Sequence, residues 1–465
     1  MISEKELAKL SYPDAPKIVT DKIPGPKSQK ILEDVPKYES MTRPPGAALP
    51  PVYDEGMGAT VKDPDGNIYI DMAAGVAVNN VGRRHPRVVK AIEEQCTKLL
   101  HAAEATSTRR SELAKKISTI MPEGLRGNCV SYFALSGSGA VETAIKFARH
   151  ITGRAQIVAF HGAYHGVWYG SGTLTTSPRI RRGYGYLIPE VIHMPYAYCY
   201  RCAFNLEYPS CGIQCGKYLD HVLNTPSTAA DNVAAVIIEP HQAEGGYVPP
   251  PPEFLKIVKE ACEKCGALFI ADEVQAGAGR TGKMWSIEHS GVVPDMVIWG
   301  KGMGGDLPMA GVTFRADLEQ KLEGCVQPQT FAGNALSCAV CMANIDILTD
   351  KNDDLLGRTA QLGEEAKGMF QVGAKSIGII GDIRGRGLMI GVELVKDKET
   401  KQPIDASVTK QILGQLLNCG VIAISCGRYS HVLRLAPSLI ITREYFKKAT
   451  DIILSVLKDV ESGAK

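Results

Sequence analysis

The chain has 465 residues, of which 45% are hydrophobic and 22% are charged, and its formal net charge is +2. This length predicts two to three domains, and the composition is that of an ordinary globular protein. The small net charge gives no long-range attraction to nucleic acid or to a membrane surface, and no apolar run approaches the roughly 18 residues that a membrane-spanning helix needs. We therefore expect a soluble protein that binds neither nucleic acid nor membrane.

The beginning of the chain, MISEKELAKLSYPDAPK, lacks the apolar segment of a signal peptide, which predicts neither export nor import into an organelle. Thirteen cysteines, an odd number spread over a large chain, favour reduced thiols over a disulfide framework. We expect a cytoplasmic protein.

The first part of the chain predicts an arm, a hairpin and a helix. Residues 1 to about 50 are rich in proline and charge, which is typical of an arm that lies on other structure. Residues 58–75 alternate apolar and polar side chains around a turn at 63–67, which predicts a β-hairpin. A helix is predicted from Pro86, because proline favours the first helical position and the following residues keep a period of about 3.6.

Residues 128–299 then alternate between apolar strands and amphipathic helices. Strands are predicted at 128–135, 155–160, 233–240, 267–274 and 296–299, and helices at 138–151 and 253–266. This alternation indicates an α/β fold whose mostly parallel, doubly wound sheet is covered on both faces. We assign residues 85–335 to one large α/β domain.

The remainder of the chain predicts a smaller α+β domain. Helices are predicted at 335–348, 353–370, 409–418 and at the C-terminal end, and strands at 386–394, 421–425 and 432–441. Helices mixed with antiparallel strands are typical of the α+β class. We expect residues 336–465 to form this domain, completed by part of residues 1–84.

Lys301 is unusual because it follows an apolar strand and stands between two glycines. An ammonium group at the end of a core strand is costly unless it reaches a cleft. A desolvated lysine has a lowered pKa and attacks carbonyl carbons, which gives such a position a chemical use. The alternative is a lysine at a surface turn whose ammonium group extends to water.

Two other strands end in carboxylates, Glu239 and Asp272. Ligands of a doubly wound sheet gather at the carboxyl ends of its strands, and buried carboxylates need partners. Alternation along the chain lets Asp272 meet a cationic ring nitrogen while Val274 packs on the ring and Gln275 reaches a polar substituent. The alternative role for Asp272 is a cap for the following turn.

A fourth strand is followed by Ser136-Gly137-Ser138-Gly139 at the start of a helix. Such a helix start offers N–H groups, a hydroxyl and the positive end of the helix dipole to a phosphate group. The alternative is an ordinary N-cap serine with glycines for the turn. Glu142 occupies the position of the third glycine of a dinucleotide-binding fingerprint, which disfavours a nicotinamide cofactor.

Seven motifs follow one another along the chain: LSGSGAVETAIKFAR, GAYHG, IIEPHQAEGG, ADEVQAGAGRTGK, WGKG, QTFAGNALSCA and RLAPSLIIT. In this order and at these separations they resemble the class III pyridoxal-phosphate-dependent aminotransferases, and among them the 4-aminobutyrate aminotransferases. The resemblance covers most of the chain. It implies pyridoxal 5'-phosphate as cofactor, the fold type I architecture of pyridoxal-phosphate-dependent transferases, and a homodimer with a shared active site.

Position by position, the resemblance makes Lys301 the lysine that forms a Schiff base and acts as general base, and it makes Asp272 the partner of the pyridinium nitrogen. Arg434 would bind the substrate α-carboxylate, and Glu244 would hold Arg434 when the substrate lacks that group. The remaining positions would bind the cofactor: Gly137 and Ser138 at its phosphate, Tyr164 and Val274 on its ring faces, Gln275 at its 3'-oxygen, Glu239, and Thr330 as a phosphate ligand from the other subunit.

The chain departs from the family pattern near the predicted cofactor. Most relatives carry different residues at Leu135 and Gly139, so we expect fewer side-chain contacts to the phosphate. The 4-aminobutyrate enzymes tend to have an arginine for the distal carboxylate where this chain has Val167. A basic run at 179–182, with Arg179, Arg181 and Arg182, is a candidate replacement, although such runs are usually solvated. His161 and His165 are expected to be loop residues that bound the cofactor.

A second departure is a pair of cysteine motifs, Cys199 with Cys202 and Cys211 with Cys215. The spacing within each pair suits a structural zinc or iron–sulfur site, but the gap between the pairs is short. We expect free thiols, with a metal site as the alternative.

These features together predict an aminotransferase that moves an amino group from an ω-amino acid or related amine to 2-oxoglutarate or pyruvate. The alternative in the same fold is an amino-acid racemase or epimerase, which keeps the lysine and the aspartate but returns the proton to the opposite face. A non-enzymatic or nicotinamide-binding protein would leave Lys301, Asp272 and Arg434 without a role.

Overall fold

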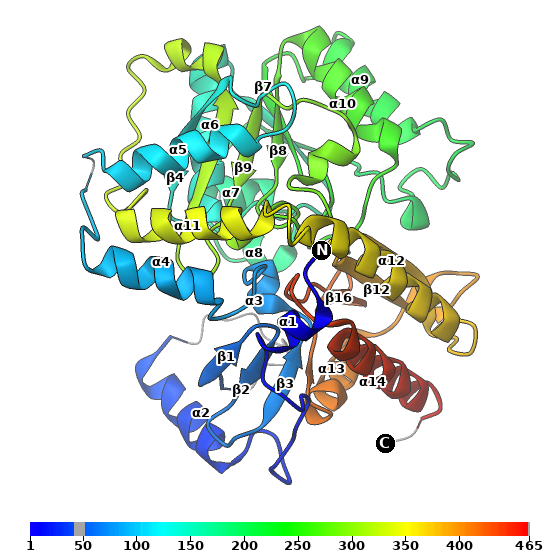
Figure 1. Cartoon of the computed structure of the whole chain (residues 1–465). Coiled ribbons are helices and arrows are strands. Elements are labelled where there is room, and N and C mark those ends of the chain that lie inside the picture. The colour runs from blue at the N-terminus through cyan, green and yellow to red at the C-terminus, as the bar shows by residue number, and fades with distance from the viewer. Residues whose placement is uncertain (41–51, 104, 186, 464–465) are drawn as a thin grey trace.

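A seven-stranded sheet, the central sheet of the large α/β region, lies in the upper half of the molecule in Figure 1. The computed structural model describes residues 1–40, 52–103, 105–185 and 187–463. The strand order of this sheet is β4-β10-β9-β8-β7-β5-β6, and β10 alone runs antiparallel to its neighbours. The mostly parallel sheet predicted from the sequence is therefore confirmed. The strands are β4 Cys129–Ala134, β5 Gln156–Phe160, β6 Val191–Met194, β7 Val233–Ile238, β8 Leu268–Asp272, β9 Met296–Trp299 and β10 Ala310–Arg315.

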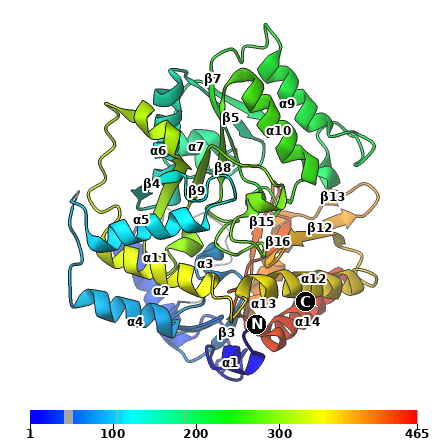
Figure 2. The ribbon, with the colours of Figure 1, turned by 45° about the horizontal axis from the view of Figure 1, so that its top comes forward.

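Helices cover both faces of this sheet (Figure 2). Alternate residues of one strand enter two different cores: Val236 and Ile238 of β7 belong to one buried cluster, and Ala235 and Ile237 belong to another. Near-continuous apolar strands are the expected consequence of burial on both faces. The helices of this region are α4 Pro86–Cys96, α5 Thr108–Ile120, α6 Gly137–Thr152, α7 Tyr169–Leu174, α8 Pro178–Arg181, α9 Gln214–Asn224, α10 Pro252–Cys265 and α11 Ala335–Leu348.

Residues from both ends of the chain build a second, four-stranded sheet of order β1-β2-β3-β14. The predicted hairpin is present as antiparallel β2 and β3, and β14 from near the C-terminus pairs with β3 in parallel. Lys17 also pairs with Ile68, so the N-terminal arm lies on this sheet, as predicted. The elements are α1 Glu4–Ala8, α2 Pro26–Tyr38, β1 Glu55–Met57, β2 Thr60–Lys62, β3 Ile68–Asp71, α3 Ala74–Ala77 and β14 Val421–Ile422.

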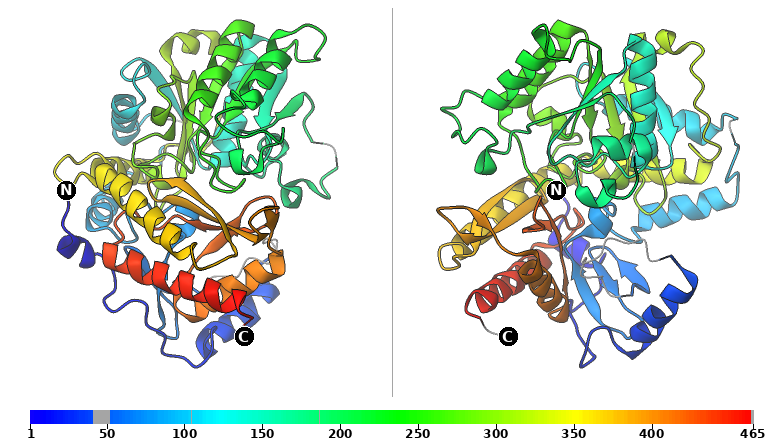
Figure 3. Two further views of the ribbon diagram at one scale, coloured as in Figure 1. Left: turned by 90° about the vertical axis from the view of Figure 1, so that its right-hand side faces the viewer. Right: turned by 180° about the vertical axis from the view of Figure 1, so that it is seen from behind.

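The C-terminal part adds a five-stranded sheet in which β11, β12, β16 and β15 follow one another and β13 pairs with β12. The yellow and red helices of this part lie beside it (Figure 3). The strand predicted at 432–441 ends at Leu435, because Pro437 has no N–H to continue the ladder. The elements are α12 Leu355–Gly373, β11 Ile380–Arg386, β12 Met389–Asp397, β13 Gln402–Pro403, α13 Ala406–Asn418, β15 Ile424–Cys426, β16 Val432–Leu435 and α14 Arg443–Glu461.

Four short 3₁₀ helices complete the assigned elements, and none of the described helices is long and apolar enough to cross a membrane. These 3₁₀ helices are η1 Cys199–Arg201, η2 Ser286–His289, η3 Lys301–Met303 and η4 Ala316–Leu322. The predicted N-terminal arm includes residues 41–50, and these lie outside the described residues.

Asn80 joins three parts of the chain. Its Nδ2 donates to the carbonyl of Ala278, and its Oδ1 accepts from Arg280, both in the loop after β8. Its own carbonyl accepts from the Leu439 N–H and from the Ser438 hydroxyl, which follow β16. Asn80 is 1% exposed, so its buried side chain and its backbone carbonyl link the segment after α3 to the loop after β8 and to the segment after β16.

Candidate active site

Lys301 begins the 3₁₀ helix that follows β9, and its backbone adopts φ +42°. A non-glycine residue with positive φ is uncommon and costs free energy, so the surrounding structure holds it there. A Cβ added at Gly302 would lie 2.3 Å from Nδ2 of Asn80, so only glycine fits next to the lysine. Burial lowers the pKa of Lys301, an effect that Asp272 opposes and Arg434 reinforces. A lysine in this state has the nucleophilic and basic character predicted from the sequence.

A cavity of about 180 Å³ opens at the carboxyl ends of the strands around Lys301. Eight of the predicted site residues line it together, which is the expected place for a ligand in such a sheet. Its lining is Ser136, Gly137, Ser138, Tyr164, His165, Gly166, Glu239, Asp272, Val274, Gln275 and Lys301.

Asp272, the last residue of β8, has both carboxylate oxygens in hydrogen bonds. Its Oδ2 lies 2.7 Å from Nδ1 of His165, and its Oδ1 accepts from the backbone N–H of Val274 at 3.0 Å. Asp272 therefore caps the following turn, which was its alternative role, and it also lines the cavity. The Nε2 atom of His165 is buried without a partner in the described part of the chain. The pair presents a carboxylate fixed in orientation to the cavity.

Glu239 lines the cavity but uses its carboxylate to shape the surrounding loops. Its two oxygens accept hydrogen bonds from the backbone N–H groups of Tyr164 and Ala243, both at 2.9 Å. Burial raises the pKa of Glu239 to about 7, and the nearby His165 opposes that rise. The side chain therefore ties the turn that carries Tyr164 to the turn that carries Glu244.

Gln275 and Tyr247 form a contact that the sequence did not indicate. The Tyr247 hydroxyl donates to Oε1 of Gln275 at 2.9 Å, and Tyr247 is fully buried. This bond fixes the amide so that its Nε2 donors remain available to a ligand oxygen. Val274 and Tyr164 also line the cavity, where each presents apolar surface to a flat ligand.

The start of α6 is built to receive an anion. The Ser136 side chain accepts from the backbone N–H of Gly139 at 3.1 Å and so caps the helix. The Ser138 hydroxyl accepts from the N–H of Val167 at 3.3 Å. A Cβ added at Gly137 would lie 2.9 Å from Cγ1 of Val274, so the backbone is approachable only because no side chain is present. The free N–H groups of the first helical turn and the helix dipole together favour a phosphate group.

The residues around the cavity suit a cofactor that carries an aldehyde, a protonated ring nitrogen and a phosphate group. An amine at Lys301 suits an aldehyde carbon, a carboxylate at Asp272 suits a protonated ring nitrogen, and the start of α6 suits a phosphate. Gln275 offers amide donors to a ring oxygen. The orphaned Nε2 of His165 and the absence of a Cβ at Gly137 are consistent with a ligand packed against this wall.

Arg434 and Glu244 form an ion pair close to Lys301. Nη1 of Arg434 donates to Oε2 of Glu244 at 2.8 Å, and the Arg434 Nε atom is buried without a partner. Burial opposes the charge of Arg434, but Glu244 outweighs that effect and the pKa of the guanidinium is raised. A buried arginine with an unused donor and a movable carboxylate partner can exchange that partner for a ligand carboxylate.

Several predicted residues lie away from this cavity. Thr330 is exposed in the turn before α11 and is not among the lining residues. Val167 is 52% exposed. Arg179 donates to the hydroxyl of Ser430, and Arg181 donates to the carbonyls of Thr173 and Thr175. Arg182 is exposed, and none of the three arginines lines the cavity, so the structure gives no support to them as a replacement.

The two histidines expected around the cofactor have separate positions. His165 lines the cavity, as predicted, whereas His161 lines a second cavity on the other side of the same loop. The partnership of His165 with Asp272 was missed because it depends on packing between the loop after β5 and the end of β8. Gly166 and Tyr247 were missed for the same reason, although Gly166 belongs to the motif GAYHG.

All four cysteines considered for a metal line one small cavity, and their thiols are free. Within residues 1–40, 52–103, 105–185 and 187–463, no group of three or more metal-ligating side chains is arranged to hold a metal ion. Burial raises the pKa of Cys215 to about 12 and that of Cys199 to about 11, so both are thiols at neutral pH.

The family model for class III aminotransferases matches residues 42–457 of this chain. An alanine/serine racemase of Pyrococcus horikoshii is 36% identical over 456 residues, covering 96% of this chain and 94% of the relative. A 4-aminobutyrate aminotransferase of Mycobacterium leprae is 35% identical over 446 residues, covering 95% and 98%. These two relatives carry out different reactions, so identity at this level does not fix the substrate.

Solved structures give the same result for the fold. A Bacillus anthracis aminotransferase superposes with a TM-score of 0.86 at 27% identity, covering 94% of this chain and all of that one. The ornithine aminotransferase of Toxoplasma gondii superposes with a TM-score of 0.81 at 27% identity, covering 94% and 96%. The architecture is fold type I of the pyridoxal-phosphate-dependent transferases, as predicted. The chain is an enzyme that belongs to the class III aminotransferase family.

Proposed function

We propose that this enzyme uses pyridoxal 5'-phosphate to move an amino group from an ω-amino acid, such as 4-aminobutyrate, or a related amine to 2-oxoglutarate or pyruvate. The observation that carries the proposal is the placement of the Arg434–Glu244 ion pair beside a desolvated Lys301. An amine donor without an α-carboxylate leaves this pair closed, and a keto acid opens it by taking Arg434. The site thus accommodates both partners of such a transamination in turn.

The residues around the cavity have separate catalytic and binding roles in this reaction. Lys301 would hold the cofactor through Nζ, and its free amine would move a proton to and from the substrate carbon. Asp272 would keep a proton on the ring nitrogen, and His165 holds Asp272 in place. When bound, pyridoxal 5'-phosphate supplies an electron sink for the pair of electrons left by the substrate C–H bond. Gly137 and Ser138 bind the phosphate, Tyr164 and Val274 hold the ring, and Gln275 and Glu239 complete the binding site.

The proposal includes a homodimer and a division into domains. Thr330 is exposed and does not line the cavity of its own subunit, which leaves it able to contribute to the cavity of a second copy. We place the large domain at 85–335 and the smaller one at 336–465 with part of 1–84. Thirteen free thiols support a cytoplasmic location.

The cofactor assignment is tested by reduction with borohydride. The purified enzyme should gain the mass of a reduced cofactor on the peptide that contains Lys301, and Lys301→Ala should gain none. A mass increase on another lysine would show that the attachment site is wrong.

The reaction is tested with a panel of amine donors. Each donor is incubated with 2-oxoglutarate or pyruvate, and the amino-acid product is quantified. We expect 4-aminobutyrate or another ω-amine to give the highest kcat/KM. A panel in which only α-amino acids react would contradict the ω-amine part of the proposal.

Racemisation is the second candidate, because a 36% identical relative is an alanine/serine racemase. It would use Lys301 to return a proton to the opposite face of the substrate carbon. Incubation with a single L-amino acid and no keto acid separates the two reactions. Formation of the D-enantiomer at a rate above that of amino transfer would replace transamination as the main activity.

A further inference from the structure

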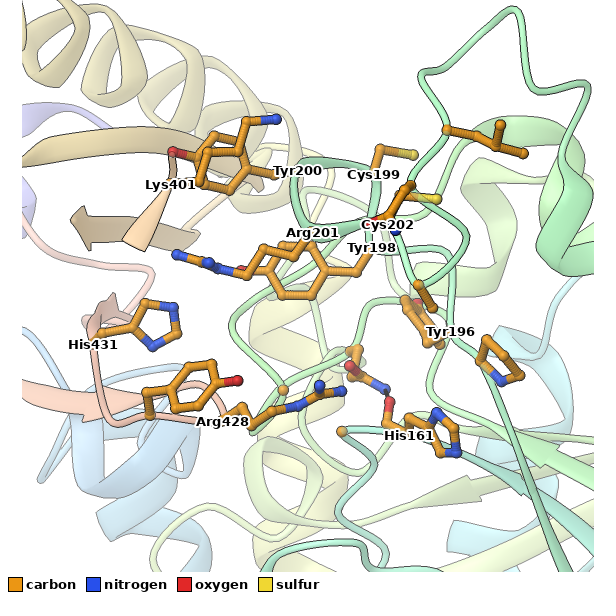
Figure 4. Close-up of a pocket in the computed structure, with 18 of the residues that line it drawn as sticks. His161, Tyr196, Tyr198, Cys199, Tyr200, Arg201, Cys202, Lys401, Arg428 and His431 are labelled. Atoms are coloured by element: carbon orange, nitrogen blue, oxygen red, sulfur yellow. Dashed lines mark hydrogen bonds between the residues drawn. The ribbon is translucent and has the colours of Figure 1, made fainter. Parts of the chain in front are cut away.

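A second cavity of about 430 Å³ lies between the segment that follows β6 and the C-terminal sheet (Figure 4). Its walls come from residues 195–207 on one side and from residues 400–401 and 428–431 on the other. This volume is within the range of about 300–1,000 Å³ that small-molecule sites occupy. The cavity can therefore hold a small organic ligand.

This cavity is distinct from the one that contains Lys301. The two share no lining residue, and the segments at 161–164 and 242–246 separate them. Gln242 stabilises this wall, because its Nε2 donates to the His161 carbonyl at 3.0 Å. A ligand in the second cavity would thus contact the back of the wall that carries Tyr164 and Glu244.

The lining carries more positive than negative side chains. Arg201, Lys401 and Arg428 line it together with one carboxylate, Glu207. Arg201 is already paired with Glu393, so Lys401 and Arg428 supply the positive charge that is left. Arg428 extends into the cavity toward His161 in Figure 4, and it has no ion-pair partner among the residues that the structure describes. Burial lowers the pKa of His161, and the charge of Arg428 lowers it further, so this imidazole does not add to the charge at neutral pH. The cavity consequently favours an anion.

Buried donors without partners also line this cavity. The Nε of Arg201 donates to Glu393 at 2.5 Å, but the Nη2 of Arg201 is buried without a partner. His431 is 1% exposed and approaches Glu393 through Nε2, whereas its Nδ1 is buried and unpaired. Buried polar atoms of this kind usually have a partner.

The cavity is connected to the substrate end of the catalytic site through the main chain. Gly245, next to Glu244, is a lining residue. The N–H of Gly427, next to Arg428, donates to the carbonyl of Glu244 at 2.8 Å. A ligand that binds Arg428 therefore contacts the same backbone segment that is hydrogen-bonded to Glu244, the partner of Arg434.

We propose that this second cavity is an accessory binding site for a small anion, carrying carboxylate or phosphate groups, which binds at Arg428. Occupancy changes the position of Glu244 and so the readiness of Arg434 to receive a substrate carboxylate. The site goes beyond the proposed transamination, because its ligand is neither converted nor in contact with Lys301.

The site is tested by melting the holoenzyme in increasing inorganic phosphate or malonate, with sodium chloride replaced to hold ionic strength constant. A ligand that binds the native state raises the melting temperature in a saturable way. We expect such a rise in the parent protein, and an apparent Kd at least about tenfold higher in Arg428→Ala, because a charge-assisted hydrogen bond is lost. Arg182→Ala is the control, since Arg182 is exposed and lies outside the cavity.

The two anions distinguish the source of the charge. A response to phosphate alone indicates a phosphorylated ligand, a response to malonate alone indicates a dicarboxylate, and either supports the site. Lys401→Ala, in an exposed loop, provides a second variant and should weaken binding by about threefold.

Two results would overturn the proposal. The first is a melting temperature that responds to both anions no more than to sodium chloride. The second is inhibition that is purely competitive with the keto acid and has the same inhibition constant in the parent and in Arg428→Ala, because the anion would then bind at Arg434. The melting experiment requires no turnover, so its outcome is independent of the proposed reaction.

Discussion

Nδ1 of His165 lies 2.7 Å from Oδ2 of Asp272 in a fully buried pair. The imidazole fixes the carboxylate, so it should act on the chemistry through Asp272 rather than on the substrate. We expect His165→Asn to retain cofactor and to lower kcat about tenfold, because one hydrogen bond to a charged group is worth about 1.5 kcal/mol. The pH dependence of the visible absorbance of the bound cofactor should shift with it. A kcat loss with an unchanged absorbance profile would indicate general damage to the fold.

Asp272 should be far more important than its partner. Two unit charges about 4 Å apart at an effective dielectric constant near 20 interact by about 4 kcal/mol, which corresponds to roughly a 1,000-fold change in rate. Asp272→Asn should therefore bind the cofactor but lose about three orders of magnitude in kcat. Single-turnover kinetics with an amine donor measure this loss, and an unchanged kcat would remove Asp272 from the mechanism.

The Arg434–Glu244 pair should distinguish substrates that have an α-carboxylate from those that lack one. Arg434→Lys replaces a bidentate contact by a single one, so we expect KM for the keto acid to rise about 10- to 100-fold. Glu244→Gln should spare the keto acid but impair amines without an α-carboxylate, since Arg434 would then be left unpaired. Steady-state kinetics of both half-reactions give the comparison. Equal losses for both substrate types would contradict a switch.

Glu393 should give the fold a stability that depends on pH. Burial opposes ionisation, but the hydrogen bond from His431 and the charge of Arg384 hold the pKa of Glu393 at about 2. An unfolded glutamate has a pKa of about 4.3, so the stabilisation is fully present above that pH and is lost as the pH falls toward 2. The pKa difference corresponds to about 3 kcal/mol.

We therefore expect Glu393→Gln to lower the free energy of unfolding by about 3 kcal/mol at pH 7. The difference in unfolding free energy between the parent and Glu393→Gln should narrow as the pH falls below about 4.3. Urea denaturation across this range measures that difference, with Glu399→Gln as the control because Glu399 is exposed. A difference that stays constant with pH would mean that Glu393 acts through packing alone.

Much of the central sheet could be predicted from the sequence because burial on both faces makes each strand a near-continuous apolar run. The ends of these runs fall at Ala134, Ile238, Asp272 and Trp299. Parallel strands bring such ends to one edge, so the cavity lining followed from their positions. Partly exposed elements gave weaker patterns, and β6, α5, α9 and β11 were not predicted. The buried strand β10 was not predicted either.

The contacts between the strand ends could not be predicted, because they depend on how separate loops pack. The pairing of His165 with Asp272 and that of Tyr247 with Gln275 join residues 107 and 28 positions apart. The second cavity is formed where the segment after β6 meets the loop at 428–431. The pattern of apolar residues within each segment does not indicate that the two segments come into contact.

Asn80 connects the turn that carries Lys301 to the segments that follow β8 and β16. Its Nδ2 leaves no room for a side chain at Gly302, and its other bonds reach the segments at 278–280 and 438–439. A hinge motion of the N-terminal and C-terminal sheets against the central sheet cannot leave this contact unchanged. The turn that carries the lysine would shift with that motion. Any displacement of either smaller sheet against the central sheet would thus be passed to the backbone next to the nucleophile.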